Sequence, residues 1–508
     1  MKSESRTKTV FLNSSISMIT QILQILLGFV VRKVFIDSLG VTYLGYNSVF
    51  TNILQMLNLA DLGIGVAITS FLFKPLGEND TERVSAIMYL YKKIYRIIGI
   101  IVLVLGIVVS FFLGVLIPDA SCSMGYLRLL YYITLAGTVS TYFLAYNRTL
   151  FIADQKSYVA NLVDSALFII TSVLQIVSLF VFENYIIYLC LQIGRNIVAN
   201  IVISVETKNR YGNFKNRDVK IVNEYKPKIV SFVKDVFISK IGSTIFYSTD
   251  NVIISSFRGS LLTGFLSNYT LITNQLTAVI NSVLSSLQAT YGNYVHSGVS
   301  VDEQRRMADN YLFVNYCIGN FCMTCFVLLA QPFVSLFFGR DMLLSDSTVL
   351  WLGINLMLGI LIQLPSQVFV IYKLFNYDKP IIAVSVGLNI IISVLLVRVI
   401  GIDGVLIGTF VTSLIYLFSR FYIISKHVFE VKVSHYLIKL SFYFCVSVVT
   451  VALTNLATCK IYVDSYLLFI AKGAAVVLLS VMIPIAILWR TREFKFLSTK
   501  VISQIRIH

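Results

Sequence analysis

Charged residues are scarce in this chain of 508 residues: only 13% are Asp, Glu, Lys or Arg, whereas 57% are hydrophobic. An ordinary soluble domain carries about 25% charged residues. Proline (7) and tryptophan (2) are also rare, and the mean hydropathy is +0.81. This composition excludes an ordinary soluble enzyme and indicates a protein that lies largely within a lipid bilayer.

The sequence also lacks the short motifs of catalysis and nucleotide binding. GxxxxGK[ST], HExxH and GxSxG do not occur, and the four histidines lack metal-ligand spacing. Most of the seven cysteines lie in apolar runs without regular spacing, which argues against a disulfide framework. The CxxC pair Cys322 and Cys325 also lies in an apolar run, where small apolar packing is favoured over a redox or metal role. We therefore predict a protein that is not an enzyme and holds no metal and no cofactor.

The excess of positive charge is arranged as in a membrane protein. The 41 Lys and Arg outnumber the 25 Asp and Glu, which gives a net charge of +16. In a nucleic-acid-binding protein these cations would form basic stripes on soluble elements. Here they gather at the ends of long apolar runs, so we expect no nucleic-acid partner.

A transmembrane helix needs about 20 mainly apolar residues. The sequence contains fourteen such runs, and their continuous apolar character predicts helices rather than barrel strands. The expected fold is an all-α polytopic membrane protein with about 14 transmembrane helices. The runs are centred within 10–31, 44–73, 97–117, 127–152, 159–182, 185–205, 235–257, 264–295, 311–338, 349–372, 381–399, 404–424, 436–456 and 465–489.

The distribution of cations predicts the orientation. With the amino terminus in the cytoplasm, 31 Lys and Arg fall in the inside segments and 7 in the outside segments. Cytoplasmic loops carry such an excess. We therefore predict a multi-pass protein of the plasma membrane with both termini in the cytoplasm.

An internal repeat divides the chain. Gly40-(x)4-Gly45-x-x-Ser48 returns as Gly259-(x)4-Gly264-x-x-Ser267, and Gln155-Lys156 matches Asp378-Lys379 at a similar offset. This predicts two pseudo-symmetric six-helix lobes, a parallel-repeat architecture found in transporters. The expected division is a lobe at 1–205, a basic cytoplasmic linker at 206–234 that rests on anionic headgroups, a second lobe at 235–430, and an appended helix pair with a tail at 431–508.

Polar side chains recur at helical spacing on corresponding spans of the two halves. Such stripes face protein or water because lipid rejects polar groups. They indicate a shared hydrophilic cavity, with interhelical hydrogen bonding as the alternative. The residues are Asn13, Ser17, Gln24, Thr51, Gln55, Asn58, Tyr247, Asn251, Asn274, Asn281 and Gln288.

Charged residues inside the spans are the main candidates for function. Arg195 and Lys240 lie within spans, and Arg32 lies at the outer end of the first span. They either pair with Asp61, Asp164 or Asp250, or they await an anionic substrate such as a diphosphate, which Arg binds in a bidentate manner. Asp61 and Asp250 are candidates for coupling to H⁺ or Na⁺, with pairing to a buried cation as the alternative.

Several segments resemble the polysaccharide flippases of the Wzx type. These segments are Leu59-Ala-Asp-Leu-Gly-Ile-Gly65, Thr249-Asp-Asn-Val-Ile-Ile-Ser255, Gly264-Phe-Leu-Ser-Asn-Tyr269 and Gly292-Asn293. Flippases of this type belong to the multidrug/oligosaccharidyl-lipid/polysaccharide exporter superfamily, which also holds MATE exporters and the lipid II flippase. The likeness covers roughly residues 8–430 and implies a MATE-like fold with a central cavity and alternating access.

The resemblance also implies the substrate and the setting. The substrate would be an undecaprenyl-diphosphate-linked oligosaccharide, moved to the outer leaflet of a bacterial inner membrane for capsule, O-antigen or exopolysaccharide assembly. A polysaccharide polymerase and a chain-length regulator would be its partners. The alternatives are a lipid II flippase, a MATE-type cation exporter, a membrane polymerase or ligase, and a non-transporting scaffold or receptor.

Overall fold

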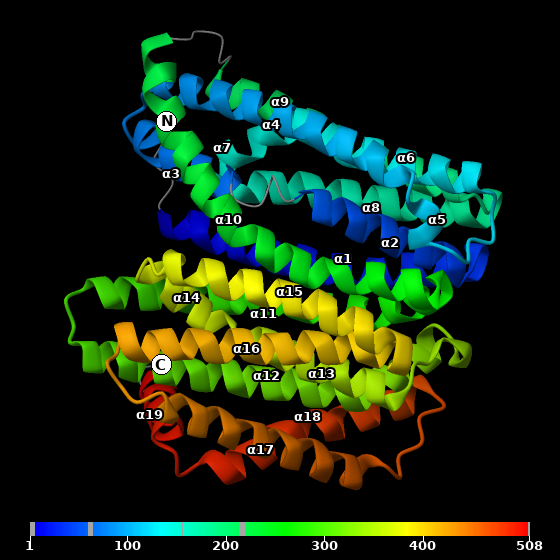
Figure 1. Ribbon diagram of the computed structural model, residues 1–508. Helices are drawn as coiled ribbons and strands as arrows, with labels where there is room; N and C mark the ends of the chain where they lie inside the picture. The colour runs from blue at the N-terminus through cyan, green and yellow to red at the C-terminus, as the bar shows by residue number, and fades with distance from the viewer. Residues whose placement is uncertain (1–5, 59–63, 155, 213–218, 506–508) are drawn as a thin grey trace. The chain divides into compact units, whose positions relative to one another are not determined.

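The computed structural model describes residues 6–58, 64–154, 156–212 and 219–505, and throughout these ranges the regular structure is helical (Figure 1). Each of the fourteen predicted spans lies on one helix or on two successive helices. Within the described ranges, nine helices are long and apolar enough to cross a membrane. The prediction of an all-α polytopic membrane protein is confirmed.

The chain forms two compact units, residues 1–264 and 265–508. The helices of the first unit are α1 (Arg6–Leu39), α2 (Val41–Leu57), α3 (Ile64–Gly77), α4 (Thr81–Ser110), α5 (Leu113–Leu116), α6 (Met124–Leu144), η2 (Ala145–Asn147), α7 (Arg148–Ala153), α8 (Ser157–Phe182), α9 (Tyr185–Tyr211) and α10 (Val219–Arg258). Helix α11 (Ser260–His296) begins in the first unit and continues in the second.

The second unit continues with α12 (Val301–Phe337), η3 (Arg340–Met342), α13 (Asp346–Leu361), α14 (Gln363–Ile371), α15 (Phe375–Ile400), α16 (Ile402–His427), α17 (Ser434–Thr458), α18 (Tyr466–Leu488) and α19 (Arg492–Ile505). Helix α9 extends to Tyr211 and α10 begins at Val219, so helix occupies both ends of the predicted linker 206–234. Helix α10 packs on α2, α3 and α4. The predicted lobe boundaries stay a prediction.

Polar caps set where several apolar helices begin. The hydroxyl of Ser300 accepts a hydrogen bond from the backbone N–H of Glu303, and the carboxylate of Glu303 accepts one from the backbone N–H of Ser300. This capping box starts α12. The side chain of Asn184 accepts from the backbone N–H of Ile186 at 2.9 Å and starts α9 in the same manner.

Two corresponding spans are each built from two helices. The predicted span 127–152 consists of α6 and α7, joined by the 3₁₀ turn η2. The predicted span 349–372 consists of α13 and α14, which meet at Ile362. These are the fourth and tenth spans, which the repeat places in equivalent positions. The break therefore recurs at the same place in each half.

The glycines of the repeated motif lie at a close backbone contact. A Cβ built on Gly45 would lie 2.0 Å from the carbonyl oxygen of Ser260, and one on Gly264 would lie 2.5 Å from the carbonyl oxygen of Val41. The offset of 219 that relates Gly45 to Gly264 also relates Val41 to Ser260. The contact is therefore reciprocal, as in a two-fold interface. It brings the amino-terminal ends of α2 and α11 so close that their backbones are in contact.

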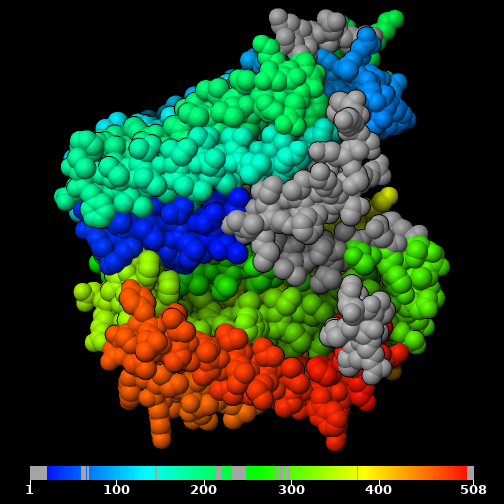
Figure 2. All heavy atoms as spheres, turned by 180° about the vertical axis from the view of Figure 1, so that it is seen from behind, coloured from blue at the N-terminus to red at the C-terminus, as the bar shows by residue number. Residues whose placement is uncertain are grey.

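Large apolar side chains are exposed along the outer helices, as expected where lipid is the solvent. On α17 and α18, Leu456 is 70% exposed and Leu467 is 78% exposed. Figure 2 shows these two helices as an orange to red-orange band on the surface of the second unit. On α8 the exposed residues include Phe180 at 69%.

A cluster of charged groups fastens α17 to α12 and α19. The Lys439 ammonium lies 3.2 Å from a carboxylate oxygen of Asp309 and 2.6 Å from one of Glu493, while His435 Nε2 lies 3.2 Å from the other Asp309 oxygen. Burial raises the pKa of the Glu493 carboxyl, but the hydrogen bond and the charge of Lys439 outweigh burial, and the net shift of this pKa is downward. The cluster therefore holds α19 against α12 and α17.

We expect Gly45→Ala to lower the melting temperature of the purified protein. The added methyl group meets backbone atoms that cannot rotate away, which costs about 1–3 kcal/mol. The matched control is Gly387→Ala, because Gly387 lies within α15 and a Cβ there meets nothing within 4 Å. That change removes a poor helix former and is expected to leave the melting temperature equal or higher. Equal melting temperatures for the two variants would contradict the close contact.

Candidate functional site

The polar stripe of α1 is partly used for helix packing. The amide Nε2 of Gln24 donates to the hydroxyl of Ser165 on α8 at 3.2 Å, and Ser165 donates to the carbonyl of Asn161 at 2.7 Å. Gln24 therefore ties α1 to α8, as in the interhelical alternative. The side chains of Asn13 and Ser17, on the same helix, lie outside the described residues.

Helix α2 presents polar side chains that no neighbour covers. Thr51 and Gln55, one turn apart on the helix, are both exposed. Asn58 follows at the carboxyl end of α2, where its side-chain oxygen accepts a hydrogen bond from the Tyr142 hydroxyl at 2.5 Å. Asp61 lies outside the described residues.

Helix α11 shows the same feature as α2. Asn274 and Asn281 are both exposed, and the side-chain oxygen of Asn281 accepts a hydrogen bond from Gln363 Nε2 on α14 at 2.6 Å. The side chain of Gln288 lies outside the described residues. Because α2 and α11 carry the two copies of the repeated motif, matched helices each expose two polar side chains within a predicted span.

Two residues of the stripe predicted on α10 are described. Asp250 and Asn251 are half-buried, and one carboxylate oxygen of Asp250 is buried. The side chains of Lys240 and Tyr247 lie outside the described residues. The roles predicted for Lys240 and Asp250 therefore stay predictions.

Arg195, on α9, makes its direct contacts with neutral groups. Its Nη2 donates to the side-chain oxygen of Asn196 at 3.2 Å, and its guanidinium carbon lies 5.4 Å from the ring centre of Phe168. Among the described residues, no carboxylate forms an ion pair with it. Asp164, one of the three carboxylates considered for this pairing, forms its direct ion pair with Arg148 and acts on Arg195 at longer range.

The partner of Asp164 is Arg148, the first residue of α7. Nη2 of Arg148 donates to one carboxylate oxygen at 2.7 Å, Nη1 donates to the other, and Nε donates to the side-chain oxygen of Asn200 at 2.9 Å. This bidentate geometry is the strongest that Arg offers to a carboxylate. The two residues fasten α7 to α8.

A second arginine–aspartate pair, not anticipated from the sequence, lies in the second unit. Arg420 on α16 and Asp378 on α15 are each 5% exposed, and Nη2 of Arg420 lies 2.7 Å from both carboxylate oxygens of Asp378. Nη1 of Arg420 donates to the Ser366 hydroxyl on α14, and its guanidinium carbon lies 4.1 Å from the ring centre of Tyr416. The signal in the sequence was an arginine inside the run 404–424 with an acidic residue just before the preceding run.

Arg32 is half-buried near the carboxyl end of α1, and its neighbour Lys33 forms an ion pair of 3.0 Å with Asp37. Within the described ranges, no group of three or more His, Cys, Asp or Glu residues is placed to hold a metal ion. The described side chains of these spans thus offer hydrogen-bonding groups and the Arg195 guanidinium, which forms no direct ion pair with a described carboxylate.

The two kinds of arginine predict different effects on stability. Arg420→Gln leaves the Asp378 carboxylate buried without its cation, so we expect a loss of about 3–5 kcal/mol and poor recovery of folded protein. Arg195→Gln removes two hydrogen bonds to the same side-chain oxygen of Asn196, and we expect a loss below about 1 kcal/mol. Thermal denaturation of both purified variants tests this difference. A melting temperature for Arg195→Gln as low as that of Arg420→Gln would show that Arg195 is a structural residue.

Comparisons with known proteins identify the fold. No family model and no curated protein matches the sequence. A lipid II flippase MurJ in an inward closed conformation is 15% identical, with a TM-score of 0.68 over 93% of this chain and 98% of that one. An inward-facing MATE multidrug transporter of the MOP superfamily is 15% identical (TM-score 0.60, 81% and 98%), and a mutant of the Vibrio cholerae MATE transporter VcmN is 16% identical (TM-score 0.56, 84% and 99%). This multi-pass membrane protein therefore has the fold shared by these flippases and transporters.

Proposed function

We propose that this protein is a flippase of the Wzx type. Its substrate is an undecaprenyl-diphosphate-linked oligosaccharide repeat unit, which it moves from the cytoplasmic to the outer leaflet of a bacterial inner membrane by alternating access. The product supplies capsule, O-antigen or exopolysaccharide assembly, with a polysaccharide polymerase and a chain-length regulator as partners. The chain itself catalyses no covalent step.

The observation that carries the proposal is the state of Arg195. A cation at the centre of a membrane helix costs at least about 2.5–3.5 kcal/mol. Arg148 and Arg420 meet this cost through bidentate carboxylates. Among the described residues, Arg195 directly contacts the neutral Asn196 and the ring of Phe168, while the Asp164 carboxylate, which Arg148 already holds, acts on it at longer range. An anionic substrate supplies the missing compensation, and a diphosphate matches the fork of a guanidinium.

The need for such a cation follows from the substrate. Moving an isolated anion into low dielectric costs on the order of 20 kcal/mol on the idealised Born estimate. Fixed cations along the route reduce this cost, and Arg195, Lys240 and Arg32 are the residues proposed for this task. The lipid tail of the substrate stays in the bilayer.

Sugar groups need hydrogen-bonding partners instead of charge. The exposed side chains of Thr51, Gln55, Asn274 and Asn281 lie within predicted spans, where polar groups face protein or water. Amide and hydroxyl groups both donate and accept hydrogen bonds, which suits sugar hydroxyls. These side chains are proposed to line the route of the oligosaccharide.

Energy for transport is proposed to come from the membrane potential and from ion coupling. An inside-negative potential favours outward movement of an anion by about 2.3 kcal/mol per charge per 100 mV. Asp61 and Asp250 are the proposed sites for H⁺ or Na⁺, since carboxylates within membranes relay ions.

A lipid II flippase is the second candidate, supported by the similarity to the lipid II flippase MurJ. Lipid II also carries a diphosphate, so Arg195 serves both candidates equally. A MATE-type exporter of cations is less well supported, because Arg195 would repel a cationic drug.

Replacement of the cations is expected to stop transport without preventing membrane insertion. In proteoliposomes that contain undecaprenyl-diphosphate-linked oligosaccharide, Arg195→Ala with Lys240→Ala abolishes translocation because the diphosphate loses its compensation. Lys472→Ala is the matched control, since it removes a cation from a span outside the proposed route. Normal translocation by the double variant would contradict the proposal, and translocation of lipid II but not of the oligosaccharide lipid would favour the second candidate.

A further inference from the structure

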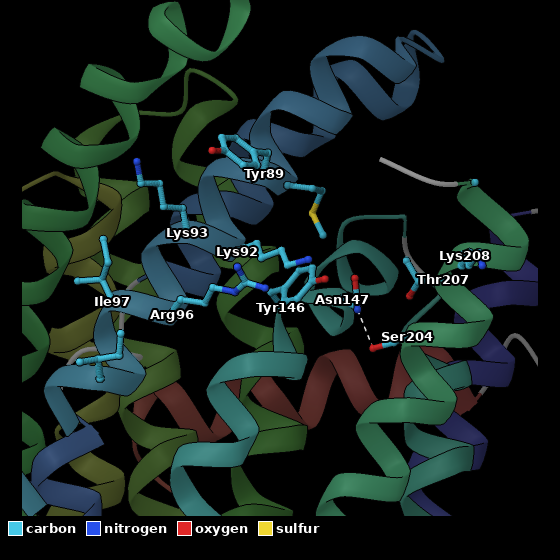
Figure 3. A pocket seen from close by; sticks show the side chains of 13 residues that line it. Tyr89, Lys92, Lys93, Arg96, Ile97, Tyr146, Asn147, Ser204, Thr207 and Lys208 are labelled. Atoms are coloured by element: carbon cyan, nitrogen blue, oxygen red, sulfur yellow. Dashed lines mark hydrogen bonds between the residues drawn. The ribbon is translucent and has the colours of Figure 1, made fainter. Parts of the chain in front are cut away.

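A basic pocket opens in the first unit, and its lining contains none of the residues of the proposed route. It has a volume of about 600 Å³ and lies among α4, η2 and α9 (Figure 3). Four cations line it, together with tyrosine, amide and hydroxyl groups. The cations are Lys92, Lys93, Arg96 and Lys208, and the other polar residues are Tyr89, Tyr146, Asn147, Ser204 and Thr207.

The four cations differ from the other cations at this end of the unit. The salt bridges found there join cations and carboxylates outside the pocket: Lys74–Glu78, Arg83–Asp80, Lys156–Asp154, Arg210–Glu206 and Lys228–Glu224. Within the part of the chain that the structure describes, the pocket cations form no such bridge. Lys92 and Arg96 are one helical turn apart, and like charges at this spacing repel each other. An anion in the pocket relieves this repulsion.

Hydrogen bonding and ring contacts hold polar groups in place in the wall of the pocket. The side-chain amide of Asn147, which is 6% exposed, donates to the hydroxyl of Ser204 at 2.7 Å. The ammonium of Lys92 lies 5.6 Å from the ring centre of Tyr146, and Figure 3 shows Lys92 and Arg96 both extending toward this ring. The pocket thus combines the hydrogen-bonded pair Asn147 and Ser204 with the cationic side chains Lys92 and Arg96.

An apolar surface continues directly from the pocket. Ile97 and Ile100 line the pocket and are 50% and 55% exposed, and along α4 the exposed stripe continues to Val104 at 54%. On α9, Val205 (53%) and Ile201 (48%) are exposed in the same way. Exposed apolar rows of this kind face lipid tails in a membrane protein. A ligand with a phosphate headgroup and acyl chains fits both surfaces, because its phosphate can bind the cations of the pocket and its chains can contact the apolar faces of α4 and α9.

We propose that this pocket binds the phosphate headgroup of an anionic phospholipid, with the acyl chains lying along the exposed faces of α4 and α9. Basic pockets between transmembrane helices bind such headgroups. The lipid is a bound partner of the first unit and is not the transported substrate. The proposal is therefore independent of the transport function.

The test compares lipids and variants of the full-length protein in nanodiscs. The purified protein is expected to retain diphosphatidylglycerol and phosphatidylglycerol in preference to phosphatidylcholine, as read by native mass spectrometry. Lys92→Gln with Arg96→Gln is expected to weaken retention of anionic lipid about 30-fold, on the basis of about 1 kcal/mol for each basic residue. The matched control is Lys74→Gln with Lys228→Gln, which removes the same charge at the same end and is expected to retain the lipid.

Several results would overturn the proposal. These are equal retention of anionic and zwitterionic lipids, equal losses in the pocket variant and the control, or displacement of the lipid by undecaprenyl diphosphate at equal concentration. Binding of inorganic pyrophosphate without any binding of phospholipid would assign the pocket to a soluble anion instead. If the pocket variant does not fold, acetylation of the wild-type protein decides, because diphosphatidylglycerol is expected to protect Lys92, Lys93 and Lys208 but not Lys74.

Discussion

A positive charge within a bilayer has to be compensated, and the means of compensation separates the arginines of this protein into two groups. Arg148 and Arg420 each grip a carboxylate with two nitrogen atoms and fasten neighbouring helices. Arg195 makes its direct contacts, among the described residues, with neutral groups, and the Asp164 carboxylate acts on it at longer range. The same comparison distinguishes the cations of the basic pocket from the paired cations around it. In both places we propose a phosphate ligand, because the described residues supply no direct ion pair there, whereas an arginine paired with a carboxylate fastens helices.

The backbone obeys a related constraint, since lipid offers no partner to a free N–H or carbonyl group. Breaks in spanning helices therefore occur where neighbouring protein groups can satisfy the chain, and they often lie near substrate routes. Here the breaks before α7 and before α14 are followed closely by residues that bind neighbouring helices. Arg148 holds Asp164, and Gln363 donates to Asn281. Each break is thus held by a contact to a neighbouring helix, and each places polar groups between helices.

The repeat was visible in the sequence as two weak motifs, and the structure supplies its physical meaning. Gly45 and Gly264 are glycines because each lies against the backbone of the other copy of the motif, where a side chain has no room. The offset of 219 relates both members of this contact.

Hydropathy was enough to predict an all-helical membrane protein, because lipid imposes a length and an apolar composition on every span; nine helices in the described ranges meet these requirements, while the number fourteen stays a prediction. The polar stripes could also be found by helical spacing alone. Only the tertiary structure decided which polar groups are used for packing, as Gln24 is, and which stay exposed, as Gln55 is. It also decided that Asp164 serves Arg148, and that Asp378 and Arg420 form a buried pair. Pairing of charges depends on distances between helices, and neither hydropathy nor the spacing within one helix contains that information.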